Sequence, residues 1–292
     1  MEVQLNPGQK KKVLLTTKFQ MLFRRKQANP EKEMSFWDHL EELRWTLLRS
    51  LIAVLSIAVL AFMNRELIFD KVILAPSTSD FITNRLLCKL GEWLSIEAIC
   101  MDTLNLQIIN ISMSGQFLTH MYISFVTGFV LGFPFVLNEI WRFVRPALKQ
   151  KEAKHSSKAV IVSSALFFLG VLFSYFLIVP LTVNFLGTYQ VSDFVSNQIS
   201  LSSYISTVVS VTFSVGVVFE LPIIIFFLTK IGLVTPAFMR KNRKYMLVIL
   251  LIISAIITPP DVFSQILVCI PLMGLYELSI YVSERIYRAG QS

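Results

Sequence analysis

The chain has 292 residues, of which 54% are hydrophobic and 16% are charged, with a net charge of +8 and a mean hydropathy of +0.63. Soluble domains usually carry about 25% charged residues, so this composition excludes the two soluble domains that the length would allow. Intrinsic disorder and nucleic-acid binding by a basic domain are disfavoured, because the apolar stretches are too many and too continuous. We therefore predict a membrane protein with several spans.

Six apolar segments are predicted to cross the membrane as helices, which indicates an all-α integral membrane protein, because about 20 apolar residues span a bilayer core about 30 Å thick. The predicted spans are residues 46–63, 117–141, 160–180, 204–228, 245–258 and 262–282. The fifth has about 14 residues, or about 21 Å of helix, because Pro259 and Pro260 end it. We predict two short final spans in a locally thinned membrane, rather than a re-entrant hairpin.

Basic residues are concentrated on one of the two faces that these spans define. All but four of the 27 Lys and Arg residues lie on the face that holds both termini, and those four lie in the first outer loop. The positive-inside rule therefore places both termini in the cytoplasm. The predicted organisation is a basic tail (residues 1–34), a six-helix membrane domain (35–285) and a short C-terminal tail (286–292). The membrane domain contains an enlarged first outer loop (64–116). The basic tail lacks the features of a signal peptide, and we expect it to contact anionic lipid.

Two segments of the predicted cytoplasmic face carry acids among basic residues. Before the first span, Asp38 and Glu42 are four residues apart and share one face of a helix. They are either ordinary acids favoured at a helix N-terminus or an anionic site. After the second span, Glu152 is the only acid between residues 142 and 158. It either forms an exposed salt bridge with a nearby lysine, which contributes little, or is a second carboxylate for a cationic ligand.

Polar residues inside or beside the later spans need a separate explanation. Glu220 lies within the fourth span, where a carboxylate costs about 2.5–3.5 kcal/mol. It is a proton site, a polar contact for another helix, or a partner in an internal hydrogen bond. Asp261 follows the predicted turn on the outer face and is expected to cap the sixth helix. Gln265 continues the same face one turn further into the membrane.

The cysteines and histidines do not form a catalytic or metal-binding pattern. Cys88 and Cys100 lie in the first outer loop, where they form either a disulfide, which would stabilise the loop by about 3 kcal/mol, or two unrelated buried thiols. Cys269 is assigned to apolar packing. The three histidines lack metal-ligand spacing, and no nucleophile or phosphate-loop motif is present. We predict no enzyme activity, no metal and no cofactor, so transport would draw energy from a gradient or a partner.

Five segments together resemble the TatC family, the multispanning receptor subunit of the twin-arginine protein translocase. They include His39-Leu40-Glu41-Glu42-Leu43-Arg44 before the first span and Thr258-Pro259-Pro260-Asp261-Val262-Phe263-Ser264-Gln265 at the last turn; the others are residues 143–148, 166–180 and 219–222. The resemblance covers about residues 35–285. It implies six helices in a concave, glove-like arrangement within the bacterial inner membrane, both termini in the cytoplasm, and an oligomeric complex that binds no nucleic acid. The first outer loop is longer than in the family and carries both Cys88 and Cys100.

The resemblance also implies roles for residues at the cytoplasmic face. Two acids match the family's contacts for the paired arginines of signal peptides, and four further residues belong to the same predicted site: Glu42 and Glu152, with His39, Leu43, Arg44 and Phe143. A carboxylate accepts a guanidinium through two parallel hydrogen bonds, which lysine does not reproduce. This geometry would distinguish a twin-arginine peptide from a twin-lysine one.

Within the membrane and at the outer face, the resemblance implies contacts with partner helices. Glu220 matches the buried acid that meets a polar residue of a single-span TatA or TatB helix, and we group Gln265 and Asp261 with it. Pro76 matches a proline of the first outer loop that is needed for translocation.

The sequence thus predicts a Sec-independent translocase subunit that binds twin-arginine signal peptides of folded precursors. It would recruit TatA/TatB-type subunits for export driven by the proton-motive force. The alternative functions are a proton-coupled small-molecule carrier that uses Glu220, and a structural membrane scaffold.

Overall fold

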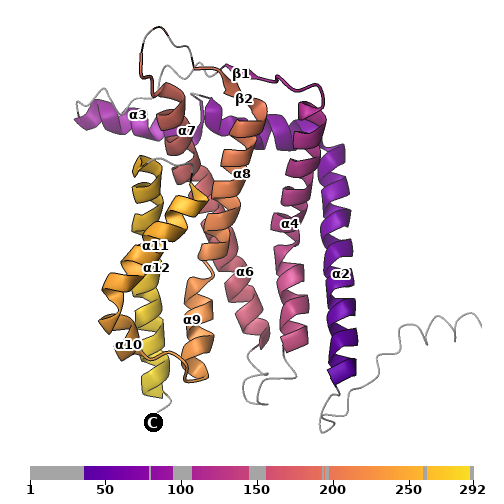
Figure 1. Cartoon of the computed structure of the whole chain (residues 1–292), viewed down its shortest axis with the longest axis vertical. Coiled ribbons are helices and arrows are strands. Elements are labelled where there is room, and N and C mark those ends of the chain that lie inside the picture. The colour runs from indigo at the N-terminus through magenta and orange to yellow at the C-terminus, as the bar shows by residue number, and fades with distance from the viewer. Residues whose placement is uncertain are drawn as a thin grey trace, which may run out of the picture. The chain divides into compact units, whose positions relative to one another are not determined.

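The computed structural model describes residues 36–78, 80–94, 107–144, 156–192, 194, 197–258 and 262–289 of the chain. The chain divides after Arg44 into two units. The described part of the first unit is the beginning of helix α2 (Phe36–Met63), which continues into the second. The second unit is almost entirely helical, and its long helices α4, α6 and α8 run alongside one another (Figure 1).

Five helical segments of the described residues are long and apolar enough to cross a membrane. Two of them are built from consecutive helices and three are single long helices, and their apolar residues come from the runs that predicted the spans. The segments are α2, α4 (Gly115–Val144), the run of α6 (Ser156–Phe173), η5 (Ser174–Ile178) and α7 (Val179–Thr188), the pair α8 (Leu201–Val218) and α9 (Leu221–Lys230), and α12 (Val262–Ala289).

Helix α11 (Arg243–Ile257) covers the predicted fifth span and is the short one. Its 15 residues correspond to about 22 Å of helix, less than an average bilayer core requires. A helix therefore covers each of the six predicted segments. The number of membrane crossings and the position of the termini stay predictions.

The third apolar segment differs from its prediction, because its helix does not end at Pro180. The backbone widens into the π-helical turn η5 immediately before this residue and continues as α7 to Thr188. Proline lacks an N–H donor and its ring crowds the carbonyl four residues earlier. A widened turn accommodates both effects and lets the helix continue.

The fourth segment and the next helix are separated by a turn with standard end signals. Gly232 has φ +81°, and the N–H groups of Gly232 and Leu233 donate to the carbonyls of Thr229 and Leu228, which closes helix α9. Thr235 then caps α10 (Pro236–Lys241) by accepting from the N–H of Phe238. This short helix was not predicted, because six residues are too few to show a helical period.

Small residues bring α6 and α8 into close contact. A Cβ atom added to Gly170 of α6 would lie 2.6 Å from the ring of Phe219, and one added to Gly216 of α8 would lie 2.8 Å from Val171. Lipid gives no hydrophobic drive for two apolar helices to associate, so such close packing holds them together. Several side chains of these two helices are fully buried, among them Phe167 of α6 and Ile205, Val211 and Val215 of α8.

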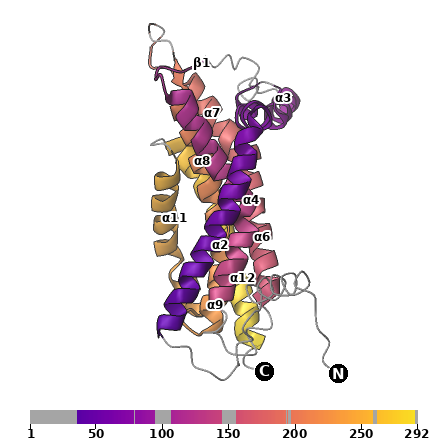
Figure 2. The same cartoon turned by 90° about the vertical axis from the view of Figure 1, so that its right-hand side faces the viewer.

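The first outer loop folds against the ends of these helices. Its described part contains η1 (Glu66–Ile73), η2 (Ala75–Ser77) and α3 (Ile82–Leu94), and α3 runs across the long helices rather than along them (Figures 1 and 2). The hydroxyl groups of Tyr175 and Tyr204 donate to the carbonyls of Val72 and Ile73, at 2.7 and 2.9 Å. Two helices of the membrane domain therefore anchor the loop.

A short parallel ladder joins the first outer loop to the segment between α7 and α8, and it departs from the predicted all-α fold. Strand β1 (Ile108–Ile109) pairs with β2 (Ile199–Ser200). Two residues cannot show the alternation of polar and apolar residues that predicts a strand. Their pairing depends on the helices that bring the two loops together.

Candidate functional site

The most deeply placed acid of the fourth predicted span is Glu220, at the break between α8 and α9. Its side chain is 9% exposed, and one carboxylate oxygen, Oε2, accepts a hydrogen bond from the hydroxyl of Ser163 on α6. The other oxygen, Oε1, is buried and has no hydrogen-bond partner among the described residues. Because an unsatisfied buried acceptor is costly, this oxygen is the point at which a donor from another molecule would stabilise the site.

The local sequence explains why Glu220 lies at this break. Pro222 occupies the first turn of α9, where its missing N–H costs nothing, but its ring prevents α8 from continuing without interruption. The carbonyl of Glu220 then accepts from the N–H groups of Ile223 and Ile224. The close approach of α6 to α8 at Gly170 brings Ser163 within reach of the carboxylate.

Other polar atoms on the same two helices are also unsatisfied. The hydroxyl oxygens of Ser164 on α6 and Thr212 on α8 are buried and have no hydrogen-bond partner in the described part of the chain. Among the described residues, no group of three or more His, Cys, Asp or Glu is placed to hold a metal ion.

The residues grouped with Glu220 as a partner-helix contact lie elsewhere or outside the described residues. Gln265 is on α12, and its amide nitrogen donates to the carbonyl of Leu251 on α11 at 3.1 Å rather than to Glu220. Asp261 lies outside the described residues. The structure therefore connects Gln265 to the α11–α12 pair, which sequence alone did not predict.

The residues predicted to bind a signal peptide are only partly described. His39, Glu42, Leu43 and Arg44 lie in the first turns of α2, in the first unit, and Glu42 is half-buried. Phe143 lies at the end of α4 in the second unit. Glu152 lies outside the described residues, so a shared site for these side chains stays a prediction.

The predicted outer-loop residues fall on the folded part of that loop. Pro76 is buried within η2, close to the carbonyls that Tyr175 and Tyr204 hold. Cys88 is half-buried on α3, whereas Cys100 lies outside the described residues, so their disulfide stays a prediction. Cys269 is a free, buried cysteine in the apolar core.

Sequence reasoning missed an ion cluster between α2 and α4. Glu139 of α4 is buried, and its carboxylate lies 3.4 Å from Arg49 of α2 and 3.4 Å from Arg142 of its own helix. It lies near the end of a predicted span, where a carboxylate can reach the interface, so the sequence did not single it out. The available signals were an arginine inside the first apolar segment and the i,i+3 spacing of Glu139 and Arg142.

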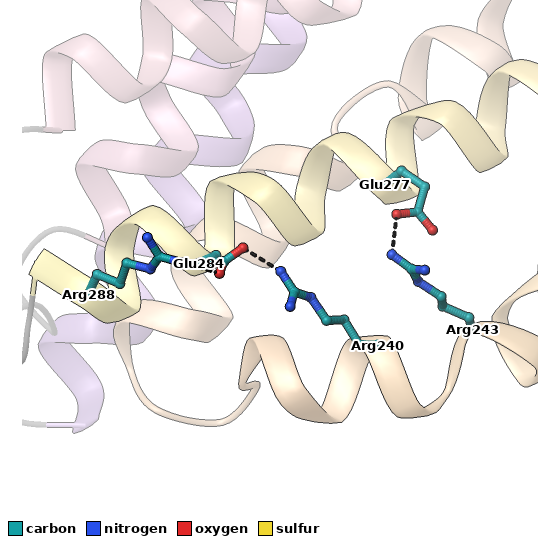
Figure 3. Close-up of polar contacts among 5 residues, drawn as sticks. All are labelled: Arg240, Arg243, Glu277, Glu284 and Arg288. Atoms are coloured by element: carbon teal, nitrogen blue, oxygen red, sulfur yellow. Dashed lines mark hydrogen bonds and ion pairs between the residues drawn. The ribbon is translucent and has the colours of Figure 1, made fainter.

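A second group of ion pairs ties α10 and the start of α11 to the end of α12 (Figure 3). Arg240 and Arg288 both contact Glu284, at 2.5 and 2.7 Å, and Arg243 contacts Glu277 at 2.7 Å. The arginines are about half-exposed or more, so each pair contributes little to stability. The two pairs that link separate helices join residues far apart in the chain: Arg240 and Glu284 are 44 positions apart, and Arg243 and Glu277 are 34. Sequence periodicity therefore did not reveal them.

Together, the helices and their apolar surfaces define a multispanning α-helical membrane protein whose polar groups are placed at helix breaks and helix ends. The family model described as Sec-independent protein translocase protein (TatC) matches residues 38–271. The chain therefore belongs to the TatC family, which confirms the resemblance seen in its sequence motifs.

Relatives and solved structures agree with this assignment. The chain is 42% identical over 257 residues to the Sec-independent protein translocase protein TatC of Blattabacterium sp. subsp. Periplaneta americana (strain BPLAN), covering 87% of this chain and 97% of that protein. It is 32% identical over 259 residues to TatCy of Bacillus subtilis (strain 168), covering 89% and 92%. A crystal structure of the twin-arginine translocase receptor TatC matches with a TM-score of 0.67 and 32% identity, covering 85% of this chain and 99% of that one.

Membership of this family makes the chain a membrane-embedded component of a Sec-independent protein translocase. Its relatives are named as translocase proteins rather than as enzymes. The general role in protein transport follows from the family.

Proposed function

We propose that this chain is the receptor subunit of a twin-arginine translocase and binds the signal peptides of folded precursors. Its membership of the TatC family over residues 38–271 carries the proposal, because a similar solved structure is named a twin-arginine translocase receptor. The protein lies in the bacterial inner membrane with six spans in a glove-like arrangement and both termini in the cytoplasm. The uneven distribution of basic residues supports that orientation.

The proposed peptide site uses carboxylates on an otherwise basic face. Glu42 and Glu152 accept the two guanidinium groups of the peptide through paired hydrogen bonds. The residues His39, Leu43, Arg44 and Phe143 complete the site. A lysine ammonium is a compact point charge without the planar fork of arginine, so a twin-lysine peptide binds less well.

The proposed contact with TatA/TatB-type subunits is centred on Glu220. Its free oxygen Oε1 accepts a hydrogen bond from a polar side chain of a single-span partner helix, while Ser163 holds Oε2. Gln265 and Asp261 contribute to partner binding at the α11–α12 hairpin. The assembled complex uses the proton-motive force, and the chain itself catalyses no reaction.

The outer loop is proposed to support translocation through Pro76 and to be stabilised by a disulfide between Cys88 and Cys100. The buried position of Pro76 beneath the tyrosine anchors supports a structural contribution. Mass spectrometry of the non-reduced protein tests the disulfide directly, since a linked peptide pair is expected and two free thiols would contradict it.

Site-specific crosslinking tests the receptor function. The double variant E42Q/E152Q is expected to lose crosslinking to a twin-arginine signal peptide, because neutral amides cannot pair with guanidinium charges. The matched control E41Q changes the adjacent exposed acid and should crosslink normally. Unchanged crosslinking in the double variant, or equal crosslinking of a twin-lysine peptide to the native protein, would contradict the proposed site.

A proton-coupled carrier is the second candidate function, and the open oxygen of buried Glu220 favours it specifically. Such a carrier would take up protons together with a small substrate when the purified chain alone is placed in liposomes. The receptor function predicts no substrate-dependent proton uptake under these conditions. A pH-sensitive dye inside the liposomes distinguishes the two.

A further inference from the structure

Residues 45–63 of α2 meet α4 along a narrow seam of small side chains. A Cβ atom added to Gly128 would lie 2.6 Å from the carbonyl oxygen of Val54 and 2.8 Å from the Cβ of Ala58. At one end of the seam, the ring of Phe62 stacks on His120 with ring centres 4.1 Å apart. The two helices therefore run in opposite directions with their backbones close together.

The apolar part of this seam restricts how far one helix slides along the other, because only a residue without a side chain fits at Gly128, but it leaves one alternative register. Gly132 lies one turn further along α4 and also faces Val54, so it would take the place of Gly128 after a displacement of one turn. Outside the seam, large apolar side chains of α2 are exposed, among them Leu47, Ile52, Val59 and Leu60. Close packing of small residues holds helices together in lipid, but van der Waals contacts have weak directional preference. A displacement by one helical turn would exchange one set of apolar contacts for another.

The charged end of the seam is different. Glu139 is 3% exposed, and its Oε2 lies 3.4 Å from the Nε of Arg49 on the neighbouring helix. The contact is an ion pair without a hydrogen bond, because the Nε of Arg49 donates to the carbonyl of Trp45. A displacement of one turn, about 5 Å, would separate the two groups and leave a buried carboxylate without its partner from α2. Removing a positive charge from beside a carboxylate that stays buried is unfavourable, even where the intact pair adds little net stability. The pair therefore discriminates against wrong registers.

We propose that the ion pair between Arg49 and Glu139 sets the register of α2 against α4 and so positions the end of α4 that carries Phe143. Glu139 precedes Phe143 by one helical turn, so both lie on the same side of α4. Arg49 and Glu139 are thus positioning residues. Their effect on peptide binding rests on the proposed receptor function, whereas their effect on helix register does not.

Arg142 provides a matched control within the same cluster. Its Nη1 lies 3.4 Å from the other oxygen of Glu139, and the exposed fractions of the Arg142 and Arg49 side chains are 41% and 40%. R49Q and R142Q each remove one of the two positive charges that lie beside the Glu139 carboxylate. Only R49Q removes a contact between two helices.

Distances between spin labels measure the register without any ligand. Labels are attached to cysteines introduced by L60C in α2 and L118C in α4, at two exposed positions. The free Cys269 is replaced by serine, and the proposed Cys88–Cys100 disulfide is kept. We expect R49Q to shift or broaden the label distance by about one turn, or 5 Å, and R142Q to keep the native distance. An unchanged distance in R49Q, or an equal shift in R142Q, would overturn the proposal.

Binding of a synthetic twin-arginine signal peptide to the native protein and its variants supplies the second measurement. We expect R49Q to weaken binding about tenfold or more, equivalent to about 1.4 kcal/mol, and R142Q to bind as the native protein does. Equal weakening by both variants would indicate a charge effect and overturn the positioning function. Absence of peptide binding by the native protein would instead refute the receptor function, and the label distances would still decide the register.

The charge-swapped variant R49E/E139R keeps the proposal testable if R49Q fails to fold. The swap retains an opposite-charge pair between the helices, so we expect it to accumulate and to show the native label distance. A displaced distance in the folded swap would overturn the proposal.

Discussion

Ser163 of α6 donates a hydrogen bond to the carboxylate of Glu220 at the break between α8 and α9, and the second oxygen of that carboxylate has no partner among the described residues. The two residues are 57 positions apart in the chain, so the contact exists only because α6 packs closely against α8. It makes Glu220 a half-satisfied acceptor in an apolar setting.

The first prediction concerns the hydroxyl of Ser163. We expect S163A to lower the free energy of unfolding by about 1–3 kcal/mol, because it leaves the buried Glu220 carboxylate without its donor. S164A is the matched control, since the neighbouring Ser164 hydroxyl is also buried but has no partner in the described part of the chain. Thermal unfolding in detergent compares the two. Equal losses would show that the Ser163–Glu220 bond does not stabilise the fold.

The second prediction concerns the contact between α6 and α8. We expect G170A to destabilise the protein by about 1–3 kcal/mol, because the added methyl group would lie 2.6 Å from Phe219. In G274A the new Cβ has no neighbour within 4 Å, so it should be neutral or slightly stabilising. Unfolding temperatures of both variants check this, and a stable G170A would contradict the close packing.

The third prediction concerns recruitment of a partner helix. If the free oxygen of Glu220 accepts a donor from a TatA/TatB-type helix, E220L should abolish copurification of that subunit, because leucine cannot accept a hydrogen bond. E220Q keeps a carbonyl acceptor and should retain part of the binding. E277Q is the control, since Glu277 already pairs with Arg243. Full copurification with E220L would exclude Glu220 as the contact.

The fourth prediction concerns the anchor of the first outer loop. We expect Y204F to remove the hydrogen bond to the carbonyl of Ile73, at a cost of about 1 kcal/mol. The loss should appear as faster hydrogen exchange around Pro76. Y245F, at an exposed tyrosine of α11, should leave exchange in the loop unchanged. Unaltered exchange in Y204F would show that the loop is held by other contacts.

Much of the helical framework could be predicted from sequence, because long apolar runs determine where helices form in a membrane protein. The short fifth helix followed from Pro259 and Pro260. The helix that continues past Pro180 did not, since the π-helical turn that accommodates proline depends on neighbouring backbone. The helices of the first outer loop and the β1–β2 ladder were also missed, because their elements are short and stabilised by contacts distant in sequence.

Of the candidate site, too, one part could be predicted from the sequence and another could not. Glu220 could be singled out from sequence because an acid inside an apolar span is unusual. Its partner Ser163 could not, since serines are common in membrane helices. Glu139 could not be singled out, because it lies near a predicted span end, although the structure buries it beside Arg49.

By itself, the sequence determined that this protein is a multispanning helical membrane protein of the TatC family, because apolar length and local motifs are properties of single segments. Only the tertiary structure decided which polar groups are satisfied. It paired Ser163 with Glu220, Arg49 with Glu139 and Tyr204 with Ile73, and it left Oε1 of Glu220 without a partner among the described residues. The physical reason is that a hydrogen bond or ion pair requires two groups within a few ångströms, and helix packing alone brings residues this far apart in sequence together.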